Sequence, residues 1–234
     1  MGADYIPEDN IFSRITKERT YTLLKRCKDA NFNAIRVWGG GYYPDDLFFD
    51  ICDELALVVF MDMMFACSLY LPDEHMLDNI AVEIRQNLER IRHHTSLALI
   101  IGNNEVEDCN LWAKNKEPWD KCILANIELF EGLIADIEKE VCPYISYIPT
   151  SPITCGHFID QSNENYGDTH YWKVWHGRLP FTEYRKHYFR YLSEFGFHSH
   201  RKRRLKNLPP RKTETSSREL WKGIREMPVQ IQRL

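Results

Sequence analysis

The stretch that decides the fold is Leu97-Ala-Leu-Ile-Ile-Gly-Asn-Asn-Glu105, in which five apolar residues lead into a turn and a carboxylate. A short, continuously apolar run of this kind is typical of a strand covered on both faces, as in a parallel sheet. A second stretch, Phe189-Arg-Tyr-Leu-Ser-Glu-Phe-Gly-Phe197, delivers Glu194 from an aromatic run. The sequence therefore predicts two glutamates at the ends of two buried strands, where a (β/α) barrel holds its catalytic groups.

Strand-like and helix-like segments alternate around these stretches, from residue 1 to about residue 198. Apolar runs predict the strands, and apolar residues three and four positions apart predict the helices. We expect strands at residues 4–7, 34–38, 57–61, 97–101, 144–148, 168–171 and 191–195. We expect helices that begin at Thr16, Pro44 and Asp78, and an amphipathic helix over residues 123–141.

This alternation predicts an α/β fold with a parallel sheet. A doubly wound sheet is disfavoured, because no Gly-x-Gly-x-x-Gly follows the first strand. We predict a TIM (β/α)8 barrel over residues 1–199 that is incomplete, with about seven strands and without the eighth.

Residues 200–234 differ in composition from the rest of the chain. They carry eleven Lys and Arg against three Asp and Glu, a net charge of +8, whereas the remainder has a net charge of −12. The segment shows no strand–helix alternation, and the motifs that are discussed for residues 2–199 do not extend into it. We interpret it as the product of a shifted reading frame and expect it to be disordered. The alternative is a basic arm that binds nucleic acid or an acidic surface.

The net charge of the whole chain, −4, does not indicate a nucleic-acid or membrane partner, and we expect neither. No apolar run is long enough to span a bilayer, and the N-terminus lacks the regions of a signal peptide. Seven scattered Cys without a Cys-x-x-Cys pair indicate reduced thiols, so we predict a cytoplasmic location. We expect no cofactor, and no metal site, because none of the nine His forms a His-Glu-x-x-His motif.

Gly102-Asn-Asn-Glu105 has two interpretations. In the functional one, Glu105 is a general acid/base and Asn104 binds a sugar hydroxyl; in the other, the segment is a simple turn, which Gly and Asn favour. Glu194 is likewise either a nucleophile or a glutamate that happens to end a strand. The two functional interpretations support each other, because retaining glycoside hydrolysis uses a pair of carboxyl groups.

Five further residues are candidates for the same site. Arg36 lies inside an apolar strand and needs a carboxylate partner, for which a catalytic glutamate is suited. Trp38, which precedes three glycines, either stacks on a sugar ring or belongs to the core. Asp62 either binds sugar hydroxyls or forms a cap or an ion pair, and we place His170 and Trp172 along the cleft.

Five motifs follow one another along residues 2–199: Arg36-Val-Trp-Gly-Gly-Gly41, Asp46-x-x-Phe-x-x-Cys-Asp-Glu-Leu55, Met61-Asp-Met-Met-Phe-Ala-Cys67, Gly102-Asn-Asn-Glu105 and Ser193-Glu-Phe-Gly-Phe197. Together they resemble the catalytic barrel of glycoside hydrolase family 2 β-mannosidases. The resemblance implies a retaining exo-hydrolase that removes terminal, non-reducing β-D-mannose from β-mannoside oligosaccharides. It also implies that Glu105 is the acid/base, that Glu194 is the nucleophile and that Asn104 holds the sugar 2-hydroxyl.

Members of that family are several times longer than this chain. They carry a β-sandwich sugar-binding domain and an immunoglobulin-like domain before the barrel and further β domains after it. The resemblance therefore implies that those domains are missing from this sequence. It also implies that the N-terminus of the full-length protein lies before residue 1.

The departures from the family raise alternatives. An open barrel leaves two unpaired strand edges, so we predict weak or no activity for the chain as it stands, and a non-catalytic truncated remnant is the main alternative. Relatives such as β-galactosidases and β-glucuronidases match the Asn-Asn-Glu and Trp-Gly-Gly-Gly motifs less well. An endo-mannanase would cleave a mannan polymer but not an aryl mannoside.

Overall fold

Five parallel strands form the main sheet. The computed structural model describes residues 1–114, 119–154 and 158–196, and the strands are β1 (Gly2–Tyr5), β2 (Ala34–Val37), β3 (Val58–Asp62), β4 (Leu97–Ile101) and β5 (Ser146–Ile148). They are hydrogen-bonded in the order β1-β2-β3-β4-β5, and each pair is parallel. Neighbours in sequence are therefore neighbours in space, so this sheet has no switch point of the doubly wound kind.

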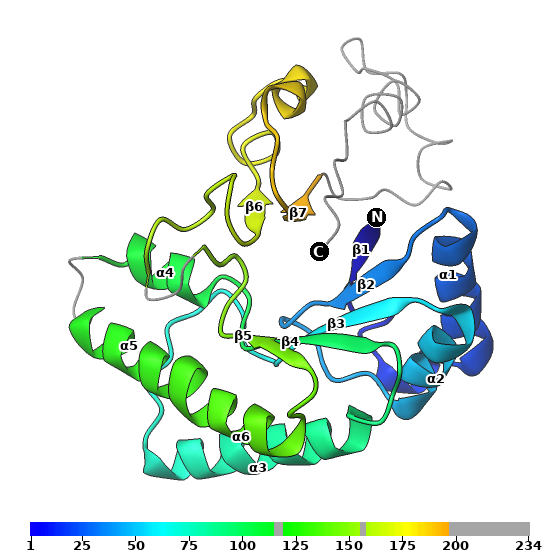
Figure 1. Ribbon diagram of the computed structural model, residues 1–234, viewed down its shortest axis with the longest axis horizontal. Coiled ribbons are helices and arrows are strands. Elements are labelled where there is room, and N and C mark those ends of the chain that lie inside the picture. Colours follow the sequence, from blue (N-terminus) through cyan, green and yellow to red (C-terminus); the bar gives the residue numbers. More distant parts are fainter. Residues whose placement is uncertain (115–118, 155–157, 197–234) are drawn as a thin grey trace.

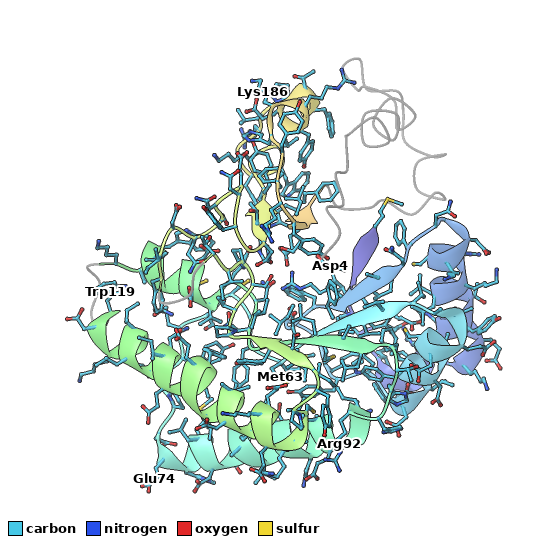
Figure 2. The ribbon with its side chains drawn as sticks, viewed as in Figure 1. Asp4, Met63, Glu74, Arg92, Trp119 and Lys186 are labelled. Carbon is cyan, nitrogen blue, oxygen red and sulfur yellow. The ribbon has the colours of Figure 1, made fainter. Side chains whose placement is uncertain are left out.

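Helices cover the outer side of this sheet (Figure 1). They include α1 (Lys17–Asp29), α2 (Asp46–Leu55), α3 (Glu74–Ile91) and α6 (Ile134–Val141). Side chains fill the space between sheet and helices, around the fully buried Met63 (Figure 2). The apolar stripes meet there, and Phe49, Ile84 and Leu88 have no exposed surface. The predicted α/β fold with parallel strands is confirmed.

Two of the predicted helix starts are confirmed. The Thr16 side chain accepts the backbone N–H of Arg19, and the Asp45 side chain accepts that of Phe48. The third prediction was wrong. The side chain of Asp73, not Asp78, caps α3 by accepting the N–H of Met76, and Asp78 lies one turn further along the helix. Either Asp can cap a helix, and the apolar spacing does not say which one does.

The segment expected to form one amphipathic helix is helical but not uniform. It comprises α5 (Trp119–Asn126), a π-helical segment η2 (Ile127–Leu133) and α6. The sequence did not predict the short helix α4 (Val106–Trp112) or the 3₁₀ segments η1 (Phe12–Arg14) and η3 (Phe181–Lys186). Helix α4 was missed because its first residues follow a turn motif, and Glu105 at its N-cap makes no side-chain capping bond.

A second, two-stranded parallel sheet pairs β6 (Thr169–Tyr171) with β7 (Leu192–Phe195). It lies across the main sheet from α3 and α6 (Figure 1). The predicted number of seven strands therefore agrees with the described residues, although they form two sheets. The segment 200–234, with the predicted disorder, lies outside the described residues. Within them, no helix is long and apolar enough to cross a membrane.

Candidate active site

Arg36 is the centre of the site. Its side chain on β2 is 5% exposed, and its Nε and Nη2 donate to Asp62 at 3.0 and 2.8 Å. Nη1 donates to Glu194 Oε1 at 2.9 Å, and Nη2 also donates to Asn104 Oδ1 at 2.8 Å. A buried guanidinium is stable where carboxylates surround it, and here it joins residues from β3, β7 and the end of β4.

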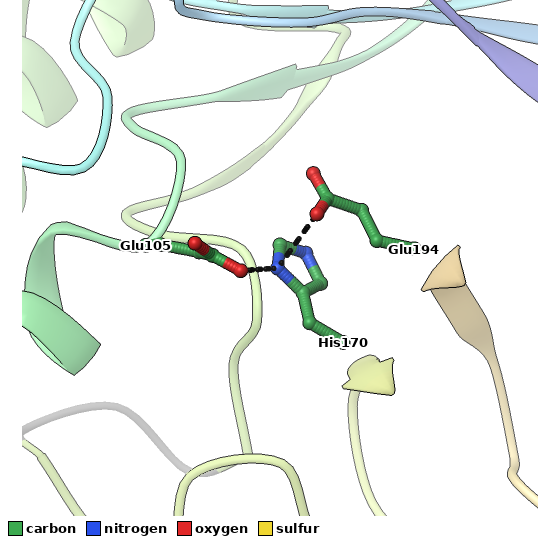
Figure 3. A group of neighbouring side chains, drawn as sticks. All are labelled: Glu105, His170 and Glu194. Atoms are coloured by element: carbon green, nitrogen blue, oxygen red, sulfur yellow. Dashed lines mark hydrogen bonds and ion pairs between the residues drawn. The ribbon is translucent and has the colours of Figure 1, made fainter. Parts of the chain in front are cut away.

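His170 connects the two glutamates (Figure 3). Its Nδ1 lies 2.7 Å from Glu105 Oε1 and 3.3 Å from Glu194 Oε2. On the other side of the ring, Nε2 lies 3.0 Å from the Ser151 hydroxyl, which donates to Asp168 Oδ2 at 2.7 Å. The ring is therefore fixed between groups from β6, the end of β4 and the segment after β5.

The distance between the two carboxyl groups is informative about stereochemistry. One oxygen of Glu105, one oxygen of Glu194 and a ring nitrogen of His170 all lie within 4.8 Å of one another. Retaining glycosidases hold their carboxyl groups roughly 5–5.5 Å apart, whereas inverting enzymes need about 6.5–9.5 Å to admit a water molecule. The short separation of these two oxygens is compatible with the retaining arrangement.

Protonation within the site follows from the same contacts. Burial alone would raise the pKa of Glu105, but the hydrogen bond and the charge of His170 outweigh it and hold that pKa below its usual value. Burial would lower the pKa of His170, but its hydrogen bond to Glu105 and the charge of Glu194 raise it overall. Both shifts favour a proton on His170, beside Glu105 Oε1, over a proton on Glu105.

Glu105 also has an unusual backbone. Its φ of 57° lies in the left-handed region, which a residue other than glycine seldom adopts. The peptide N–H of Glu105 donates to the carbonyl of Ser151 at 2.8 Å, which holds the residue in this conformation. Strained residues of this kind gather at functional sites.

The other predicted site residues occupy different positions. The Asn104 amide is buried, and its Nδ2 contacts Cys67 Sγ at 3.4 Å. The Trp172 indole donates to Glu194 Oε2 at 3.1 Å. Trp38 is half-buried with its ring against Gly40, and no described contact joins it to either glutamate.

Asp62 forms an ion pair, which is one of the roles that the sequence left open for it. Its carboxylate is fully buried and accepts hydrogen bonds from Arg36 and from the N–H of Gly39. Of the two roles that the sequence left open, the structure supports the ion pair.

Sequence reasoning missed several contributors. Cys67 donates to Glu105 Oε2 at 3.4 Å, and Ser151 and Asp168 hold His170. Asp4 lies 4.0 Å from Arg36. Cys67 comes after a predicted strand and Asp168 begins one, so the ends of strands were the available signal. Ser151 gave none, since it lies in a loop.

Glu105, His170 and Glu194 offer a ligand set that could hold a metal ion. The Arg36 guanidinium, however, contacts Glu194 at 2.9 Å and lies 3.4 Å from His170 Nε2. It already supplies the positive charge that a cation would bring, and it would repel one. The arrangement is therefore better suited to carboxylate chemistry than to metal binding.

Comparison with known proteins finds β-mannosidases among the relatives of this chain. A β-mannosidase B from Thermothelomyces thermophilus is 35% identical over 204 residues, and the match covers 83% of this chain and 24% of that protein. For β-mannosidase B from Neosartorya fischeri the identity is 36% over 184 residues, covering 75% of this chain and 22% of that protein. A crystal structure of β-D-mannosidase from Dictyoglomus thermophilum superposes with a TM-score of 0.76 and 34% identity, over 88% of this chain and 25% of that one.

The chain is β-mannosidase-like, of the glycoside hydrolase family 2 type. No family model matches it. A Bacteroides uniformis β-glucuronidase 3 shares the fold of this β-mannosidase-like chain, with a TM-score of 0.54 and 23% identity over 74% of this chain and 20% of that one. The chain spans about a quarter of the length of the curated relatives it matches.

Proposed function

We propose that this chain carries the catalytic site of a retaining exo-β-mannosidase, which removes terminal, non-reducing β-D-mannose from oligosaccharides. The observation that supports this most strongly is the pair of glutamates whose nearest oxygens lie within 4.8 Å, joined through His170, with Arg36 bound to Glu194. The relatives named β-mannosidase support the choice of sugar.

In the first step, a carboxylate oxygen of Glu194 attacks the anomeric carbon. The glycosidic C–O bond breaks, and its electron pair goes to the departing oxygen, which takes a proton from Glu105. Since His170 Nδ1 lies 2.7 Å from Glu105 Oε1, the imidazolium supplies that proton as the departing oxygen approaches.

In the second step, Glu105 removes a proton from water, and the water oxygen displaces Glu194 from the anomeric carbon. Arg36 and the Trp172 indole orient Glu194 and stabilise its negative charge when it leaves. We assign Asn104 to the sugar 2-hydroxyl, with its buried amide N–H as donor.

We further propose that residues 1–199 are the catalytic segment and that their strands belong to a (β/α)8 barrel. The consecutive order β1-β2-β3-β4-β5, the helices on one side and the placement of all site residues near strand ends support this.

The test is hydrolysis of an aryl β-mannoside by the purified chain, with Glu194→Gln as a matched control. We expect weak release of the phenol by the parent chain, no release by the variant, and retained configuration in the mannose that is seen first by NMR. Equal rates for both chains would contradict the proposal. Cleavage of a mannan polymer without cleavage of the aryl mannoside would indicate an endo-acting enzyme instead.

A further inference from the structure

Asp4 is a buried carboxyl group that the mechanism above does not use. It lies on β1 in register with Arg36 on β2, so the two side chains project from neighbouring positions of the same sheet face. Its Oδ1 is buried without a hydrogen-bond partner in the described part of the chain. Asp4 lies on the side of the sheet that faces β6 and β7 (Figure 2).

Asp4 and Glu194 approach the same atom of Arg36. Glu194 Oε1 lies 2.9 Å from Nη1, whereas Asp4 Oδ1 lies 4.0 Å from it, beyond hydrogen-bond distance. The other nitrogens of the guanidinium donate to Asp62 and Asn104, and Nη1 also lies 3.4 Å from His170 Nε2. After Glu194, Asp4 is therefore the nearest carboxyl group that can accept a hydrogen bond from Arg36 Nη1.

The charges around Asp4 explain why Glu194, and not Asp4, is the partner of Arg36 Nη1. It faces Arg36 from β2, Asp62 from β3, His170 from β6 and Glu194 from β7. Burial raises the pKa of Asp4 to about 7, and the carboxylates of Glu194 and Asp62 add to this while Arg36 opposes it. Asp62 and Glu194 are thus the two carboxyl groups bonded to the guanidinium, and the raised pKa of Asp4 favours its protonated form.

We propose that Asp4 is a positioning residue that replaces Glu194 as the partner of Arg36 while Glu194 carries the sugar. This inference rests on the proposed function, because Glu194 loses its charge only when it bonds to the anomeric carbon. Glu194 is then a neutral ester. Asp4 releases its proton to solvent, which its 24% exposed side chain can reach, and its carboxylate pairs with Arg36 Nη1.

Hydrolysis reverses the exchange. When water displaces Glu194, the nucleophile regains its negative charge and its hydrogen bond to Arg36, and Asp4 takes up a proton from solvent. The net charge around Arg36 is the same in both states. The guanidinium consequently keeps its place, which returns Glu194 to the geometry needed for the next cycle.

The test is a titration of the Asp4 carboxyl carbon by NMR, in the full chain labelled with ¹³C at Asp and Glu side chains. The signal is assigned as the one absent from Asp4→Asn. Glu194→Gln is isosteric and neutral, so it imitates the loss of charge at Glu194 without any turnover. We expect the Asp4 midpoint to fall by about one to three pH units in Glu194→Gln, the usual effect of an adjacent arginine. An unchanged midpoint would overturn the proposal.

Glu107 is an internal control in the same spectra. Burial and the charge of Glu131 raise its pKa to about 7 as well, but neither Arg36 nor Glu194 is among the causes of its shift. Its midpoint should stay constant, so a shift shared by Asp4 and Glu107 would indicate a general change of structure and would also refute the exchange.

A second measurement tests the proposal without Glu194→Gln, in case that variant does not fold. The unsubstituted chain, with Glu194 esterified by a 2-deoxy-2-fluoro-α-mannosyl group, should show the same lowered Asp4 midpoint. The aryl mannoside assay is independent of these titrations. Failure of the proposed function would appear as equal hydrolysis by the parent chain and Glu194→Gln, whereas failure of the exchange would leave that assay unaffected.

Discussion

The five-stranded sheet and the β6–β7 pair both contribute residues to one site, but they pack against apolar clusters of very different size. Behind the sheet, a large apolar cluster includes Phe49, Leu88 and Ile100, which have no exposed surface. The pair rests on a cluster whose buried members are Tyr171, Val174 and Tyr184. The Glu105 side of the site is thus supported by packing, whereas the Glu194 side depends on polar contacts.

Those polar contacts cross from one region to the other at the site itself. Arg36 on the sheet binds Glu194 on β7, and His170 on β6 contacts Glu105 after β4. The interactions assigned to catalysis therefore also hold the two regions together. Substitutions at the crossing contacts should affect stability more than substitutions at surface contacts of the same chemistry.

The largest expected effect is that of Arg36→Met. It leaves Asp62 and Glu194 buried without their cation, and breaking a buried ion pair in this way costs about 3–5 kcal/mol. Urea unfolding followed by circular dichroism would measure the loss. The matched control is Arg85→Met, whose partner Glu140 is 65% exposed and whose ion pair lies at the surface. It should cost at most about 1 kcal/mol, and equal losses would contradict the comparison.

The next effect is on the pH dependence of stability. Burial raises the pKa of Asp4 and of Glu107 to about 7 and that of Asp108 to about 6. An acid whose pKa is higher in the folded state stabilises the fold below its unfolded pKa, and this contribution is lost as the pH rises toward the folded value. The chain should therefore be more stable at pH 5 than at pH 8, by about 2 kcal/mol or more.

Thermal unfolding across this pH range tests that sign. The double variant Asp4→Asn with Glu107→Gln should show a flatter curve, since two of the titrating groups are gone. A parent chain that becomes more stable as the pH rises from 5 to 8 would contradict the assignment.

A smaller difference is expected between the two regions in hydrogen exchange. Amides of β3 and β4 should exchange through global unfolding, because their strands are covered by the large cluster. Amides of β6 and β7 should exchange at least about tenfold faster, which corresponds to an opening free energy about 1.4 kcal/mol lower. Similar protection in all four strands would show that the polar contacts make the regions one cooperative unit.

The smallest effect is that of Cys67→Ala. A thiol is a weak hydrogen-bond donor, and Cys67 donates to Glu105 Oε2 at 3.4 Å. Its removal should lower kcat/KM for an aryl mannoside by less than about tenfold. Cys67→Ser, which retains a donor, should behave like the parent chain. A loss of several hundredfold in Cys67→Ala would give the thiol a catalytic role far larger than a weak donor can have.

Much of the main sheet could be predicted from the sequence. The strand at Leu97–Ile101 matches its predicted bounds, because a short apolar run bounded by turn residues is too short for a buried helix and fits a covered strand. Local signals failed where two residues could serve equally well, as with Asp73 and Asp78 at the start of α3. They also failed for α4, whose N-cap residue Glu105 makes no side-chain capping bond.

The candidate site was predicted in part. The need of a buried arginine for carboxylates anticipated the contact between Arg36 and Glu194. The roles of Asp62 and Trp38 remained open, because a strand end shows that a side chain lies near the site but not which way it points. Ser151 and Asp4 gave no chemical signal of their own, since both act through contacts with residues distant in sequence.

The central claim is that Glu194 is the nucleophile of a retaining β-mannosidase site. The most direct measurement is incubation of the chain with 2-deoxy-2-fluoro-β-D-mannosyl fluoride, followed by mass spectrometry of its proteolytic peptides. We predict one fluoromannosyl group per chain, on Glu194, and none in Glu194→Gln. A label on Glu105, or hydrolysis of an aryl mannoside by a chain that never acquires a label on Glu194, would contradict the claim.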